Sequence, residues 1–108
     1  MAIAMSMRWR GASKENYDRV MEILDLDSEP PAGALFHVSG HDGEALRILD
    51  IWESEDAWNA FLNGRLGAAV AEAGVEGQPD VTIYPIHNVF VADKAELERM
   101  GSRAAVGA

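Results

Sequence analysis

The sequence contains no cysteine, which excludes disulfides, thiolate catalysis and cysteine-based metal sites. It is also poor in basic residues, because nine Lys and Arg stand against eighteen Asp and Glu, for a formal net charge of −9. Nucleic-acid phosphates and anionic lipid surfaces repel such a chain, and its basic residues form no cluster. We therefore expect neither a nucleic-acid partner nor a membrane partner.

Long hydrophobic runs are missing as well. No segment approaches the roughly 20 apolar residues that a membrane helix needs. The first residues lack the basic stretch followed by an apolar run that marks a signal peptide, so a cytoplasmic protein is expected. The chain has 108 residues, of which 48% are hydrophobic and 25% charged, enough for one domain with a modest core.

The spacing of apolar residues predicts the element order β-α-β-β-α-β. Residues 2–9 alternate as in a strand, and Ser13 is expected to cap a helix that runs to about Asp27. Further strands are expected over residues 34–40 and 45–53. A second, continuous helix is expected between Ser54 and Gly74.

The last strand is expected over residues 81–90. Pro85 interrupts it, which favours a place at the edge of the sheet. These elements form a domain of residues 1–92. Residues 93–108 are expected to form a short helix capped by Asp93, followed by a mobile tail.

Right-handed crossovers turn this order into an α+β, ferredoxin-like βαββαβ fold. It is a four-stranded antiparallel sheet of order 4-1-3-2 with both helices on one face. The third strand is apolar on both faces, because Ile48 and Trp52 alternate with Leu49 and Ile51. Strands of this kind are buried on both sides, whereas the helices cover only one. The sequence therefore predicts a homodimer through the other sheet face.

The segment from the third strand into the second helix carries a family resemblance. Residues 48–58, ILDIWESEDAW, resemble the strand-to-helix junction of the dimeric α/β-barrel superfamily, which includes the antibiotic biosynthesis monooxygenase-like (ABM) domains. Element order and length extend the likeness to roughly residues 1–90. The resemblance implies a sheet-to-sheet dimer, a dimeric α/β barrel, with a small-molecule pocket between sheet and helices in each subunit. The superfamily hosts many chemistries, so it does not name an activity.

Haem-degrading relatives hold iron with a histidine in the later turns of the second helix. Residues 68–72 read AAVAE here, without a histidine, so haem is not expected. The three histidines come from different elements and lack helical spacing, so no metal site is expected either. The leading hypothesis requires neither a metal nor an organic cofactor.

The Asp42-Gly43 pair is typical of a tight hairpin turn. With these two as turn residues, His37 faces Ile48 and becomes a diagonal neighbour of Asp50, on the same face as Trp52. A carboxylate within an apolar strand needs a partner, and His37 is one candidate beside Ser39, Arg8 or an interfacial group. His37 could then be a general base oriented by Asp50, or the pair could be structural and fix register or dimer contacts.

Other candidate residues are less specific. His87, on the last strand, could donate to a carbonyl or act as an alternative base, or it could lie at the sheet edge. Aromatic side chains could line a substrate pocket or form plain core: Trp9, Trp52, Trp58, Phe61 and Tyr84.

Two hypotheses from different classes follow. The first is a cofactor-independent oxygenase or isomerase that removes a proton from a hydrophobic, aromatic small molecule. The second is a non-catalytic dimeric ligand-binding or accessory protein that uses the same cavity or none.

Overall fold

The computed structural model describes residues 1–101, which form one four-stranded antiparallel sheet with helices. The elements in chain order are β1 (Ile3–Arg10), α1 (Lys14–Leu24), β2 (Ala34–His41), β3 (Ala45–Trp52), α2 (Glu55–Phe61), the π-helical turn η1 (Leu62–Leu66), α3 (Gly67–Ala73), β4 (Asp80–Pro85) and α4 (Lys94–Arg99). The strand order β2-β3-β1-β4 confirms the predicted order 4-1-3-2. The expected mobile tail falls mainly on residues 102–108, outside the described residues.

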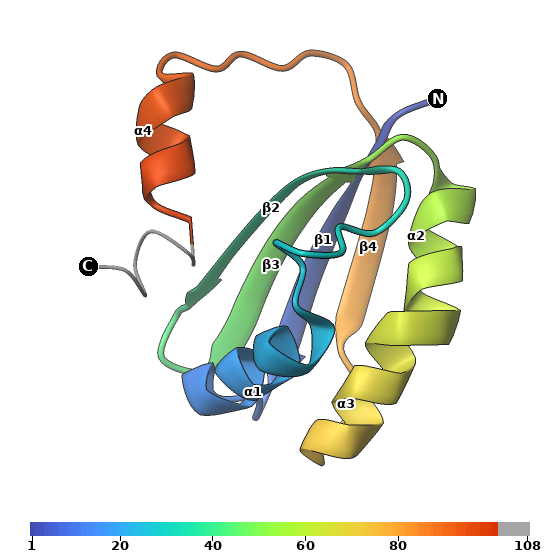
Figure 1. Ribbon diagram of the computed structural model, residues 1–108, viewed down its shortest axis with the longest axis vertical. Helices are drawn as coiled ribbons and strands as arrows, with labels where there is room; N and C mark the ends of the chain where they lie inside the picture. Colours follow the sequence, from blue (N-terminus) through green and yellow to red (C-terminus); the bar gives the residue numbers. More distant parts are fainter. Residues whose placement is uncertain (102–108) are drawn as a thin grey trace.

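The core lies between the sheet and two helical rods on one of its faces. Figure 1 shows α1 and the α2–α3 rod over the same side of the sheet, whereas α4 stands apart beside β2. Alternate side chains of β1 and β3 point into this core, and Met5 is fully buried there. No helix among residues 1–101 is long and apolar enough to span a bilayer.

The start of α1 follows the expectation from the sequence. The Ser13 side chain accepts the backbone N–H of Asn16 at 3.0 Å, and the Asn16 side chain accepts the N–H of Ser13 at 3.0 Å. This reciprocal cap satisfies two backbone donors that a helix start otherwise leaves free. The helix ends at Leu24, three residues before the predicted end, because Asp25 adopts a left-handed conformation with φ 49°.

The second helix is not continuous, contrary to the prediction. A π-helical turn, η1, separates α2 from α3, and Gly64 within it has the non-helical angles φ −114° and ψ −107°. Glycine adopts such angles at little cost. The turn leaves Arg65 able to donate to the carbonyl of Leu24 at 2.9 Å, so the second helical rod caps the C-terminus of α1.

The last strand is shorter than predicted. It ends at Pro85 instead of continuing to residue 90, and its position at the sheet edge agrees with that proline. One further backbone bond joins Ile86 N to Ala2 O at 3.1 Å. Beyond it the chain leaves the sheet, so His87 and Phe90 are not strand residues.

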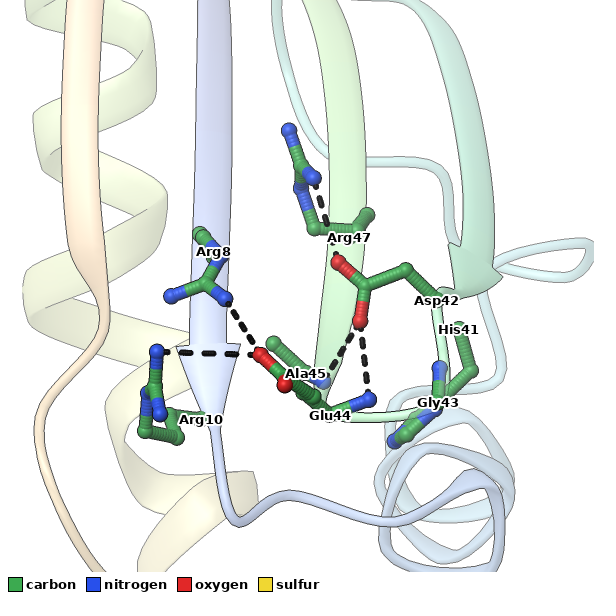
Figure 2. A network of polar contacts seen from close by, with 8 residues as sticks. All are labelled: Arg8, Arg10, His41, Asp42, Gly43, Glu44, Ala45 and Arg47. Atoms are coloured by element: carbon green, nitrogen blue, oxygen red, sulfur yellow. Dashed lines mark hydrogen bonds and ion pairs between the residues drawn. The ribbon is translucent and has the colours of Figure 1, made fainter.

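The register of the β2–β3 hairpin differs from the prediction by one turn position. Gly43 and Glu44 are the central turn residues, and His37 lies directly opposite Asp50 instead of opposite Ile48. The Asp42 side chain explains the shift. Its Oδ1 accepts the N–H groups of Glu44 and Ala45, each at 2.9 Å, as Figure 2 shows. These bonds lower the pKa of Asp42 to about 2.

The moved turn changes cross-strand partners without changing faces. Pairing shifts by two positions along the partner strand, and side chains alternate with a period of two. His37, Asp50 and Trp52 therefore share one face, as predicted, and that face is the one covered by the helices.

Two glycines with positive φ provide a test of how β2 packs against α2. A Cβ on Gly33 (φ 84°) would lie 2.7 Å from the Ala57 Cβ, whereas a Cβ on Gly43 (φ 99°) meets nothing within 4 Å. We expect Gly43→Ala to cost about 1–2 kcal/mol, from backbone strain alone. Gly33→Ala should cost roughly 1–3 kcal/mol more, because α2 must move. Urea unfolding measures both, and equal losses would contradict close packing at Gly33.

Candidate functional site

A cavity of about 420 Å³ lies between the sheet and the helices, which we call the inner cavity. Its walls are mainly apolar side chains of β1, β3, α1 and the second helical rod, including Met5, Val20 and Leu66. Small-molecule sites in proteins are concave, largely apolar and carry a few placed polar groups. The polar groups here include Tyr17 and the predicted pair, His37 and Asp50.

Asp50 is the buried carboxylate on this wall, with 5% of its surface exposed. Its Oδ1 lies 2.6 Å from His37 Nδ1, and its Oδ2 accepts the indole N–H of Trp52 at 3.1 Å. An unpaired carboxylate at this depth would cost several kcal/mol. Both oxygens of Asp50 are therefore satisfied, one by imidazole and one by indole.

The imidazole of His37 connects Asp50 to α1. Its Nε2 lies 2.7 Å from the hydroxyl of Tyr17, and the two rings are stacked at 5.9 Å with an interplanar angle of 5°. Four side chains thus form one continuous hydrogen-bonded chain, which we call the relay: Tyr17, His37, Asp50 and Trp52.

The chemistry of the partners fixes the protons in the relay when His37 is neutral. The indole N–H of Trp52 can only donate, and a buried carboxylate can only accept. His37 Nδ1 therefore donates to Asp50, and Nε2 accepts the hydroxyl proton of Tyr17. The Tyr17 oxygen keeps lone pairs that a ligand in the cavity can reach, because Tyr17 also lines that cavity.

The surroundings of Tyr17 keep its phenol protonated. Burial raises the pKa of Tyr17, a hydrogen bond with Ser39 acts against this, and the carboxylates of Asp50 and Asp18 raise it further. At neutral pH the resting relay therefore holds a phenol, and a tyrosinate does not form without proton transfer to His37.

Aromatic packing holds Trp52 in place. Its ring lies 5.7 Å from Trp58 and 5.4 Å from Phe61, both in tilted arrangements. Trp9 is fixed separately, because its indole N–H donates to the carbonyl of Glu76 at 3.0 Å. These contacts fix the orientation of the inner cavity's aromatic wall.

Most residues singled out from the sequence gather at this cavity. Six of the eight line it: Trp9, His37, Asp50, Trp52, Trp58 and Phe61. Tyr84 does not, because it faces the opposite side of the sheet and is 46% exposed. His87 lies beyond the end of β4, exposed and away from the relay.

Tyr17 is the residue that the sequence interpretation missed as a functional candidate. Helical spacing places it in the apolar stripe of the first helix, together with Val20, Met21 and Leu24. Its hydroxyl was the available signal, because a phenol within a stripe that faces a core needs a hydrogen-bond partner. The partner could not be identified without the docking geometry of α1.

Among residues 1–101, no three His, Asp or Glu side chains are grouped as a metal site. What the relay can do is accept a proton at the Tyr17 oxygen while His37 takes up the phenol proton and Asp50 stabilises the resulting imidazolium.

No protein-family model matches the chain, and no curated protein matches it in sequence. Solved structures share its fold. A protein of unknown function from Nitrosomonas europaea aligns with TM-score 0.65 and 17% identity, over 85% of this chain and 95% of that one. The cofactor-independent oxygenase SnoaB of Streptomyces nogalater aligns with TM-score 0.59 and 8% identity, over 82% and 94%. A candidate antibiotic biosynthesis monooxygenase of Caulobacter crescentus aligns with TM-score 0.59 and 16% identity, over 81% and 91%.

These likenesses show that the chain has the ferredoxin-like fold of the ABM-like proteins, as the resemblance of residues 48–58 implied. Identities below 20% carry no activity from one protein to another.

The burial of Tyr17 can be tested spectroscopically. The chain has two tyrosines, so Tyr84→Phe leaves Tyr17 as the single phenol that ionises. Its ultraviolet titration should have a midpoint above pH 10, because burial raises the pKa. A raised pKa stabilises the fold below about pH 10, and this contribution is lost as the pH rises through the folded-state value. A midpoint at or below pH 10 would contradict the burial of Tyr17.

Proposed function

We propose that this protein is a small-molecule enzyme that removes a proton from an acidic hydroxyl, enol or activated CH group of a hydrophobic compound. One observation carries the proposal: a Tyr17–His37–Asp50 chain of short hydrogen bonds ends at an apolar cavity. Such an arrangement pairs a base with a group that orients it, next to space for a substrate.

In this proposal the substrate contacts Tyr17, because the phenol occupies Nε2 of His37. The substrate proton passes to the Tyr17 oxygen as the phenol proton passes to His37. The Asp50 carboxylate, held by Trp52, stabilises the imidazolium and keeps the ring oriented. His37 and Asp50 are thus positioning and proton-storing groups, and Tyr17 is the catalytic residue that touches the substrate.

Two reaction types use the resulting anion without a metal or organic cofactor. Return of the proton to another atom gives an isomerase. In an oxygenase, the anion is the reductant and dioxygen the oxidant, so that a CH₂ group and O₂ give a carbonyl group and water. The fold shared with SnoaB, a cofactor-independent oxygenase, supports the second type as an analogy.

The inner cavity indicates what the substrate resembles. Its aromatic wall favours a flat, hydrophobic ring compound over a charged metabolite. The cavity volume of about 420 Å³ lies within the range of small-molecule sites, about 300–1,000 Å³. We place this activity in the cytoplasm, as expected from the sequence.

We also propose that the protein works as a homodimer through the sheet face opposite the helices. Five large apolar side chains lie together on that face: Phe36, Val38, Leu49, Ile51 and Tyr84. A contiguous patch of this kind marks an interaction surface in soluble proteins. A second copy of the chain, related by a two-fold axis, covers it with the same patch.

The hairpin end of this face is polar without being strongly charged. Arg8 lies directly opposite Arg47, and their like charges would repel each other. Figure 2 shows how acidic side chains offset them: Glu44 pairs with Arg8 and Arg10, and Asp42 pairs with Arg47. This network gives the proposed interface a polar rim, and its three arginines are largely offset by two acidic residues, so it does not strongly repel a second copy.

Variants of the relay test the catalytic proposal. Oxygen uptake and ultraviolet spectra would be recorded with a panel of naphthols and enolisable polycyclic ketones. We expect Tyr17→Phe and His37→Gln to lower turnover about 100-fold or more, the usual contribution of a general base. His87→Gln is the control, because His87 is an exposed histidine beyond the end of β4 and lies outside the cavity.

The outcome separates enzyme from binding protein. Loss of turnover with a nearly unchanged melting temperature in Tyr17→Phe supports catalysis. If no panel compound reacts and the variants lose only stability, the relay is structural, and a non-catalytic ligand-binding role replaces the proposal.

Two leucines of similar exposure test the dimer. Leu49, on the open sheet face, is 38% exposed, and Leu62, in η1, is 36% exposed. Analytical ultracentrifugation should find the unmodified protein and Leu62→Lys as dimers and Leu49→Lys shifted to monomer. The buried charge in Leu49→Lys has no partner at an apolar interface. A monomeric unmodified protein, or equal behaviour of the two variants, would refute the interface.

A further inference from the structure

A second hollow lies beside the inner cavity, between α4 and the edge formed by β2 and α1. We call it the outer hollow; it has a volume of about 510 Å³. It is not separate from the site described above, because both spaces share wall residues. The shared residues are Tyr17, Met21, Leu26, Asp27, Phe36 and His37. The Tyr17–His37 end of the relay therefore stands between two spaces.

The far wall of the outer hollow is made by α4. Leu97 of α4 and its C-cap residue Met100 line it on this side. Opposite them lie Met21 of α1 and, at the β2 edge, Phe36 and Val38, which also belong to the apolar patch of the open sheet face. Leu97 is 45% exposed and Met100 is 70% exposed, so α4 presents apolar side chains to this space without filling it. Figure 1 shows α4 beyond the β2 edge, reached by an extended segment that follows β4.

The charge of the outer hollow limits what can occupy it. Asp25 and Asp27 line its rim, and the whole chain carries a net charge of −9. A carboxylate or phosphate group would meet an unfavourable potential there. An apolar group without negative charge fits both the walls and the rim.

We propose that the outer hollow is a second substrate subsite that takes an uncharged apolar extension of the molecule bound in the inner cavity. The inference rests on the proposed function and adds to it. The substrate has two parts, a flat ring system in the inner cavity and a flexible or second apolar part beneath α4. Its reacting hydroxyl or CH group lies between these parts, at Tyr17. Leu97 and Met100 are then specificity-determining residues.

Two isomeric ligands of equal hydrophobicity, compared with their unsubstituted parent, test for the second subsite. The three tryptophans all line the inner cavity, so quenching of their fluorescence reports binding without any turnover. The probes are 1-naphthol, 2-hexyl-1-naphthol and 6-hexyl-1-naphthol. The chain of the 2-isomer leaves the ring beside the hydroxyl, toward the outer hollow, whereas that of the 6-isomer points into the inner cavity. We expect the 2-isomer to bind about tenfold more tightly than 1-naphthol, since even two buried methylenes give that gain. The 6-isomer should bind more weakly than the 2-isomer, because its ring and its chain must share the inner cavity.

Variants of α4 and its C-cap test whether the tighter binding of the 2-isomer arises in the outer hollow. Leu97→Glu and Met100→Glu should each remove the advantage of the 2-isomer and leave the affinity for 1-naphthol unchanged. Ala95→Glu is the matched control, because it places the same charge on the same helix outside the hollow's lining, and it should keep the advantage. A fourth probe, 2-(5-carboxypentyl)-1-naphthol, should lose most of the gain because of Asp25 and Asp27.

The outcomes separate this inference from the proposed function. If 1-naphthol binds and the two hexyl isomers bind equally, the second subsite is refuted and the inner site stands. The second subsite is equally refuted if the Glu variants have no effect, as when a segment of a partner subunit fills the hollow. If none of the probes quenches the tryptophans, the inner cavity is not a site for aromatic alcohols, and both proposals fail.

Discussion

The buried carboxylate of Asp50 is the constraint on which the rest of this structure depends. Met5, its β1 neighbour, is fully buried, so the charge of Asp50 must be met by polar side chains and not by water. His37 and Trp52 each donate a hydrogen bond to this carboxylate. Because His37 donates through Nδ1, its proton lies on that nitrogen when the ring is neutral. That tautomer in turn directs an acceptor toward Tyr17. A requirement of stability thereby produces an oriented chain of proton donors and acceptors.

Strand β3 combines this constraint with a second one. Alternate positions send Asp50 toward the helices and Leu49 and Ile51 toward the open face. A strand that is apolar outward and carries its charge inward is costly unless both faces are covered. The relay covers the charge on one side, and the proposed partner subunit covers the apolar residues on the other. The interface and the site would then lie back to back across one layer of backbone.

Much of this arrangement could be predicted from the sequence, because alternation and helical spacing determine faces and order. The turn was predicted one position too early. The Asp42-Gly43 pair favours a turn centred on these two residues, whereas the Asp42 carboxylate stabilises a turn centred on Gly43 and Glu44. His37 therefore lies opposite Asp50 instead of diagonal to it, on the sheet face that was predicted. The π-helical turn and the role of Tyr17 were missed for a different reason. Both depend on how helices dock on the sheet, and apolar periodicity does not specify docking.

Docking of α1 is therefore inseparable from the chemistry of the site. Tyr17 comes from α1, His37 from β2 and Asp50 from β3, so the relay exists only when all three elements are in register. The helix is held at both ends: His41 of β2 donates to the carbonyl of Ala12 just before its start, and Arg65 of η1 donates to the carbonyl of Leu24 at its end. Sliding α1 by one residue, about 1.5 Å, would break a 2.7 Å hydrogen bond to His37. The interruption at Gly64 thus has a consequence at the relay, because it leaves Arg65 where it can hold the helix that carries Tyr17.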